Sequence, residues 1–129
     1  MKYALYPGCA AQGATPELYQ STRAIIGRLG IEVVELSAAA CCGAGVVTEA
    51  DPDMAVALNA RTFAQAEALG LDVMTICGPC QGVMSAANRR LKTEAGLLDR
   101  INTLLEPEGL TYHGNVQVKH LLWIVVRDI

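Results

Sequence analysis

Three short apolar segments, separated by stretches with helical character, constrain the fold of this chain most strongly. The segments are Lys2–Tyr6, Ile31–Leu36 and Leu71–Ile76. The helical stretches between them open at Thr15-Pro16-Glu17 and Asp51-Pro52-Asp53 and end before Gly30 and Gly70. A capping residue followed by proline is a typical helix start, and glycine is a typical stop. Alternation of strand and helix at this spacing predicts an α/β fold with a parallel sheet.

The remainder of the chain has a less regular pattern. We expect a helix after Cys77-Gly78-Pro79-Cys80, most helix-prone over Ala86–Lys92, and another over Leu97–Leu105 that ends at Pro107-Glu108-Gly109. A fourth strand is predicted at Leu110–His113, and a helix beginning near Val118 is predicted within Val118–Ile129. The sequence therefore predicts a single domain over residues 1–129, with a small parallel sheet of about four strands flanked by helices, Rossmann-like or flavodoxin-like.

Composition and charge exclude several classes of function. The chain has 129 residues, of which 52% are hydrophobic, and its mean hydropathy is +0.30. Its longest apolar run, Leu121–Val126, is far shorter than the roughly 20 residues that span a bilayer. The N-terminus is too short an apolar segment for a signal peptide. Net charge is −3, and no basic cluster exceeds Arg89, Arg90 and Lys92, so we expect no nucleic-acid partner.

Five cysteines are the most informative residues for function. They make up about 4% of the chain, whereas a disulfide scaffold has more than about 8–10%. Without a secretion signal we expect a cytoplasmic location, where clustered cysteines are typical of metal ligands or redox thiols.

The cysteines follow the predicted strands. One lies beyond the first strand, two beyond the second and two directly beyond the third: Cys9, then Cys41 and Cys42, then Cys77 and Cys80. Because parallel strands end at one edge of a sheet, where α/β proteins bind ligands, we expect the five sulfurs to converge there. The flanking glycines Gly8, Gly43, Gly45 and Gly78 let backbone N–H groups approach the sulfurs, and helix N-termini nearby favour negative charge.

The residues alone leave alternatives open. Cys77 and Cys80 by themselves are compatible with a thioredoxin-like dithiol, and Cys41 and Cys42 with a vicinal disulfide. Four of the five cysteines suffice for a zinc site or an ordinary cubane cluster. Five buried structural cysteines without a metal are a further interpretation. A fifth converging thiolate is surplus unless one sulfur bridges irons.

The motifs resemble one known family. The opening Tyr6-Pro7-Gly8-Cys9, the Cys41-Cys42-Gly43 and Cys77-Gly78-Pro79-Cys80 motifs and the segment Val118-Lys119-His120 are similar to the cysteine-rich CCG domain of heterodisulfide reductase. Related domains occur in glycolate oxidase, lactate-utilisation enzymes and archaeal-type succinate dehydrogenases. The resemblance implies a noncubane 4Fe–4S cluster held by Cys9, Cys41, Cys42, Cys77 and Cys80. Family members carry two such domains in tandem, so residues 1–129 would be the N-terminal half of a two-domain subunit.

The resemblance also implies a function. It is that of a thiol/disulfide oxidoreductase subunit in which the cluster itself is the catalytic centre, with His120 a secondary candidate as ligand or proton donor; the isolated domain would be inactive. Alternatives are an electron-transfer subunit of a flavin-linked dehydrogenase and a zinc-stabilised interaction domain.

Expected partners are a second CCG domain, or iron–sulfur and flavin subunits of a redox complex, with self-association also open. Such partners would place the domain in the cytoplasm or at the membrane periphery. The run Leu121–Val126 is more apolar than an exposed helix, so we expect a second domain or chain to cover it. We expect Tyr3, Tyr6 and Trp123 to be packing residues, and His113 to lie in a turn.

Overall fold

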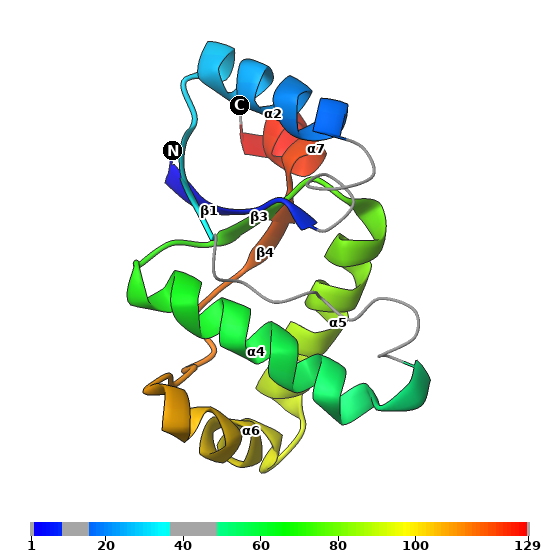
Figure 1. The fold of residues 1–129 in the computed structure, drawn as a ribbon, viewed down its shortest axis with the longest axis vertical. Coiled ribbons are helices and arrows are strands. Elements are labelled where there is room, and N and C mark those ends of the chain that lie inside the picture. The colour runs from blue at the N-terminus through cyan, green and yellow to red at the C-terminus, as the bar shows by residue number, and fades with distance from the viewer. Residues whose placement is uncertain (1, 9–15, 37–48, 129) are drawn as a thin grey trace.

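A parallel sheet forms the centre of the protein. The computed structural model describes residues 2–8, 16–36 and 49–128. Within these residues the sheet has four strands in the order β2-β1-β3-β4, and every neighbouring pair is parallel (Figure 1). The strands are β1 (Lys2–Tyr6), β2 (Glu32–Glu35), β3 (Val73–Thr75) and β4 (Val118–His120). The predicted α/β fold with a small parallel sheet is confirmed.

Helices cover both faces of the sheet. Helices α2 (Pro16–Leu29) and α7 (Leu121–Trp123) lie on one face, and α4 (Pro52–Ala68), α5 (Gly78–Thr93) and α6 (Leu97–Leu105) lie on the other (Figure 1). Alternate residues of β1 serve the two layers, as the pleat of a strand requires. Tyr3 and Leu5 belong to the buried cluster on the α2 side, whereas Ala4 and Tyr6 belong to the cluster on the α4 side.

The helix that precedes β3 begins where the sequence predicts. Asp51 is the N-cap of α4, and its side chain accepts a hydrogen bond from Met54 N at 3.1 Å. Pro52 occupies the first turn, where its missing N–H costs nothing. Gly70 follows the helix with φ +70°, a conformation that glycine adopts without strain. The predicted span from Asp51 to Leu69 agrees with the structure to within a residue at each end.

The fourth strand lies later in the chain than predicted. The segment Leu110–His113 is irregular, and β4 is formed by Val118–His120 instead. Backbone N–H groups of His113 and Asn115 donate to the Glu67 carboxylate at 3.0 and 3.1 Å, so they have partners without a sheet. The helix predicted from Val118 begins only at Leu121, after β4 has paired with β3.

The C-terminal segment continues from α7 into a short π-helical turn at Ile124–Asp128, named η2. Leu121 and Ile124 are buried against the sheet, while Leu122, Trp123 and Val126 are exposed. Tyr3 and Tyr6 are buried as expected, but the packing role predicted for Trp123 is wrong within the described residues, because its side chain is 55% exposed. No described helix combines the length and apolar character needed to cross a membrane.

A buried polar cluster joins α5 to the segment before β4. The Tyr112 hydroxyl donates to Asn88 Oδ1 at 2.6 Å, and Asn88 Nδ2 donates to the Val116 carbonyl at 2.8 Å. Tyr112 is fully buried, with its ring 5.4 Å from that of Phe63. Burial raises the pKa of Tyr112 to about 12, because the phenolate would lose its hydration.

Replacing Tyr112 should remove part of the alkaline sensitivity of the fold. The unfolded chain releases the Tyr112 proton near pH 10, whereas the folded protein keeps it to about pH 12. The wild-type free energy of unfolding therefore falls as pH rises through this window. We expect Tyr112→Phe to be less stable at neutral pH by about 1–3 kcal/mol, because Asn88 loses its donor.

The difference in free energy of unfolding between wild type and Tyr112→Phe should narrow by roughly 1 kcal/mol per pH unit above pH 10. Urea titrations at several pH values measure it. Parallel stability curves for wild type and variant would contradict the assignment.

Candidate metal centre

Cys77 and Cys80 lie at the carboxyl end of β3. Cys77 is the N-cap of α5, in an extended conformation with φ −120° and ψ 128°, and Cys80 lies in the first turn. Gln81 N donates to the Cys77 carbonyl at 3.0 Å and so closes this turn. Residues three apart share a face of a helix. The helix thus begins inside the cysteine motif rather than after it, which makes the spacing of the two sulfurs a property of α5.

The two thiols differ in exposure. Cys77 is half-buried, whereas Cys80 is buried with 6% of its surface accessible. Cys80 belongs to the same buried cluster as Tyr6 and Leu36, which stand at the ends of β1 and β2. The cysteine turn beyond β3 and the carboxyl ends of β1 and β2 therefore contribute to one buried cluster.

Gly8, which follows β1, lies beside Cys80. It follows β1 with φ +78°, and a Cβ added to it would lie 3.3 Å from Cys80 Sγ. A side chain here would therefore be strained in its backbone and would press on the sulfur. Gly8, the residue directly before Cys9 in the sequence, therefore lies beside Cys80.

Three of the five predicted ligands, Cys9, Cys41 and Cys42, lie outside the described residues. Among the residues that are described, no group of three or more His, Cys, Asp or Glu side chains is placed to hold a metal ion. The described part of the predicted site is compatible with a metal centre. Two thiols on one helical turn are soft ligands, and the missing side chain of Gly8 leaves space beside the buried Cys80.

His120 ends β4 beside this edge. Its Nδ1 accepts a hydrogen bond from Leu122 N at 3.1 Å, and it is the N-cap of α7. In the neutral ring the proton is therefore on Nε2. Its place in the fold is thus accounted for by capping. His113, which the sequence predicts to lie in a turn, comes earlier in the chain, before β4. Its Nδ1 is 2.6 Å from Glu67 Oε1.

An open cavity adjoins the cysteine turn. It has a volume of about 410 Å³ and its lining is mainly apolar: Gly78, Gln81, His120, Leu122, Trp123 and Val126. Gly78 directly follows Cys77, so this cavity reaches the start of α5. The sequence did not predict it, because one wall comes from α5 and the other from the C-terminal segment of β4, α7 and η2, which is far from α5 in the chain.

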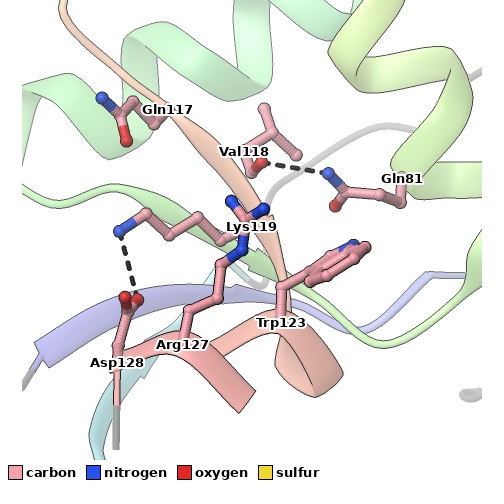
Figure 2. Close-up of a pocket in the computed structure, with 7 residues that line it drawn as sticks. All are labelled: Gln81, Gln117, Val118, Lys119, Trp123, Arg127 and Asp128. Carbon is pink, nitrogen blue, oxygen red and sulfur yellow. Dashed lines mark hydrogen bonds and ion pairs between the residues drawn. The ribbon is translucent and has the colours of Figure 1, made fainter. Parts of the chain in front are cut away.

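A second cavity of about 410 Å³ lies beside β4 and is also lined by Trp123 (Figure 2). Lys119 Nζ is 3.3 Å from Asp128 Oδ2, and the Arg127 guanidinium lies 4.9 Å from the centre of the Trp123 ring. Gln81 lines both cavities and donates to the Val118 carbonyl at 3.0 Å. Sequence reasoning missed Gln81, although its position directly after Cys80 is the feature that points to it.

A parallel α/β sheet with paired thiols at its carboxyl edge defines a cysteine-rich α/β domain. Residues 3–85 match the family model of the cysteine-rich domain CCG, and the chain belongs to this family. The resemblance drawn from the cysteine motifs is thereby confirmed.

Named relatives of this chain are subunits of reductases. The chain is 34% identical over 128 residues to the 8-methylmenaquinol:fumarate reductase membrane anchor subunit of Wolinella succinogenes. It is 31% identical over 130 residues to a heterodisulfide reductase subunit-like protein of Archaeoglobus profundus. These matches cover 99% and 100% of the chain but only 44% of each relative. The chain therefore spans less than half the length of the relatives it matches.

The fold also occurs in a solved structure. A hypothetical protein from Helicobacter pylori superposes with a TM-score of 0.85 at 17% sequence identity, over 95% of this chain and 25% of that one. At this identity the likeness shows the shared α/β fold alone.

Gly8 and Gly70 form a matched pair for testing whether the closeness of Gly8 to Cys80 affects stability and metal content. Both have positive φ, but an added Cβ meets Cys80 Sγ at 3.3 Å only at Gly8, while at Gly70 nothing lies within 4 Å. We expect Gly70→Ala to lower the free energy of unfolding by about 1 kcal/mol through backbone strain alone. Gly8→Ala should cost more, by roughly a further 1 kcal/mol, and should reduce the metal content of anaerobically purified protein.

Urea unfolding and metal analysis of both variants measure these effects. If Gly8→Ala and Gly70→Ala had equal free energies of unfolding and equal metal content, the nearby Cys80 thiol would not be the reason that Gly8 must lack a side chain.

Proposed function

We propose that this chain is the iron–sulfur domain of a heterodisulfide reductase-like thiol/disulfide oxidoreductase. In this proposal a noncubane 4Fe–4S cluster is held by Cys9, Cys41, Cys42, Cys77 and Cys80. The observation that carries it is the closeness of Gly8 to the buried Cys80 sulfur, which puts the end of β1 beside the cysteine turn of α5. Membership of the cysteine-rich family, and relatives named as reductase subunits, support it.

The described residues suit this role in three ways. Cys80 is buried among apolar side chains, which would shield a sulfur ligand from water, while half-buried Cys77 stands nearer the surface. The cavity beside Gly78 offers a mainly apolar wall on which the body of a thiol or disulfide could lie. His120 lines the same cavity, and in the neutral ring its Nε2–H would donate a hydrogen bond to a sulfur atom of a bound thiol or disulfide.

The overall chemistry has a simple balance. Reduction of a disulfide to two thiols breaks the S–S bond and consumes two electrons and two protons. A bound cluster would supply the electrons one at a time, from iron–sulfur or flavin subunits of the same complex. We place such a complex in the cytoplasm or at the membrane periphery.

A second candidate function is electron transfer in a flavin-linked dehydrogenase. It is favoured by the relative named as a fumarate reductase anchor subunit, which is 34% identical to this chain. In that role the cluster would relay electrons without binding a disulfide. A zinc-stabilised interaction domain is the remaining alternative, since zinc takes the same thiolates.

The apolar surface around Trp123 bears on the partner. Leu122 is 68% exposed and Val126 73% exposed, next to the open cavity at the start of α5. Contiguous exposed apolar residues of this kind mark interfaces. Because the relatives are more than twice as long as this chain, we propose that a second cysteine-rich domain covers this surface, and that a second copy substitutes for it in isolation.

Anaerobic reconstitution should load about four irons and four sulfides per chain, with thiolate-to-iron absorption and an EPR signal after a change of one electron. Each single change of Cys9, Cys41, Cys42, Cys77 or Cys80 to Ser should lower iron content and alter the spectrum, because no sulfur is spare. Ala87→Ser, which places a hydroxyl at a buried position of α5 away from the thiols, is the control and should keep its iron.

Zinc without iron in protein handled anaerobically would remove the proposed cluster. Unchanged iron and EPR in one cysteine variant would favour an ordinary ligand set of four.

The isolated chain should self-associate at micromolar concentration and lack disulfide reductase activity. Leu122→Ser should shift light scattering toward the monomer, because it weakens the surface around Trp123. Leu104→Ser is the matched control: Leu104 is 63% exposed, against 68% for Leu122, but lies on α6. A strictly monomeric chain with robust disulfide reductase activity would show that one domain suffices.

A further inference from the structure

We propose that Gln81 is a positioning residue for the cysteine turn: its side-chain amide fixes the first turn of α5 against β3 and β4. The effect of Gln81 on a bound cluster rests on the proposed function, whereas the effect of Gln81 on the thiols of the metal-free protein does not.

Every polar atom of the Gln81 side chain is engaged. Its Oε1 accepts a hydrogen bond from Thr75 Oγ1 at 2.5 Å, and its Nε2 donates to Ser85 Oγ at 2.9 Å and to the Val118 carbonyl at 3.0 Å. The Val118 carbonyl can only accept, so the amide nitrogen must face β4 and the oxygen must face Thr75. The orientation of the amide is therefore determined by its partners.

Two of its three partners, Thr75 and Val118, belong to the sheet. Thr75 is fully buried at the end of β3, where it is in register with His120 of β4. Val118 is the first residue of β4 and is in register with Val73. Figure 2 shows the Gln81 side chain reaching from α5 toward β4. One amide thus ties α5 to both strands on this side of the sheet.

Within the described residues, two local features that usually stabilise the first turn of a helix are missing from α5. Cys77 makes no side-chain capping hydrogen bond, and Pro79 has no backbone N–H. Gln81 follows Cys80 directly, and its own N–H closes the turn onto the Cys77 carbonyl. Rotation of this turn would move the Cys80 sulfur relative to Gly8, so the amide of Gln81 determines where that sulfur is held.

Asn88 provides a matched comparison on the same helix. Its Nδ2 donates to the Val116 carbonyl at 2.8 Å and its Oδ1 accepts from Tyr112 at 2.6 Å, so it also ties α5 to the segment of β4. It lies two helical turns beyond Gln81. Its loss should cost stability without disturbing the cysteine turn.

The test compares Gln81→Leu with Asn88→Leu in the metal-free, reduced full chain. Alkylation of each cysteine by iodoacetamide is followed by peptide mass spectrometry, at urea concentrations that give the two variants equal global stability. We expect Gln81→Leu to raise the alkylation rate of Cys80 about tenfold over Asn88→Leu, because only the cysteine turn opens locally. Equal Cys80 rates in the two variants would overturn the proposal.

A second pair keeps the test valid if Gln81→Leu fails to fold. Thr75→Val removes the donor to Gln81 Oε1 at nearly constant shape, and Thr75→Ser retains it. We expect faster Cys80 alkylation in Thr75→Val and a rate near the wild type in Thr75→Ser. Identical behaviour of the two Thr75 variants would count against the role of Gln81.

Reconstituted protein supplies a separate readout. If the wild type binds iron and sulfide, Gln81→Leu should change the EPR spectrum and midpoint potential, while Asn88→Leu should leave both unchanged. An unchanged spectrum in Gln81→Leu would overturn the consequence for the cluster. A local effect on Cys80 together with a wild type that binds no iron would sustain the role of Gln81 and refute the proposed function.

Discussion

The pairing of β1 with β3 is the interaction on which the rest of the structure depends. Ala4, at the centre of β1, pairs with Val34 on one side and with Val73 on the other, and its N–H donates to the Asp72 carbonyl at 2.8 Å. Because the strands are parallel and in register, Tyr6 and Thr75 end side by side. Gly8, beyond the end of β1, and the cysteine turn, beyond the end of β3, are thereby brought to one edge of the sheet.

The cysteine turn of α5 is held by tertiary contacts more than by local ones. A typical helix start has a polar cap, but Cys77 provides none. Side-chain amides that face β4 and the segment before it stabilise the helix instead, Gln81 near the thiols and Asn88 further along. In the part of the chain that the structure describes, the Cys77 side chain makes no capping hydrogen bond at the start of α5.

Among the described residues, the two faces of the sheet are unequally covered. Helices α4, α5 and α6 lie on one face, whereas α2 and the short C-terminal segment with α7 lie on the other (Figure 1). Leu121 and Ile124 complete this thinner layer, and their neighbours Leu122 and Val126 face outward. The asymmetry agrees with relatives that extend well beyond the length of this chain.

Local sequence signals for the starts and ends of helices and strands determined most of the elements. Proline and aspartate at the start of α4, glycine after it, and the apolar run of β1 act within a few residues, so they can be recognised without knowledge of the fold. The alternation of these elements also predicted the parallel sheet, and hence the common edge for Cys77, Cys80 and Gly8.

The tertiary structure alone decided the rest. The segment at Leu110–His113 has the composition of a strand, but Glu67, remote in sequence, takes the N–H groups of His113 and Asn115, and β4 forms only at Val118. Likewise, the closeness of Gly8 to Cys80 and the hydrogen bonds of Gln81 bring together residues from different elements. No local pattern encodes these contacts, because the free energy that selects them comes from burial and hydrogen bonding between segments far apart in the chain.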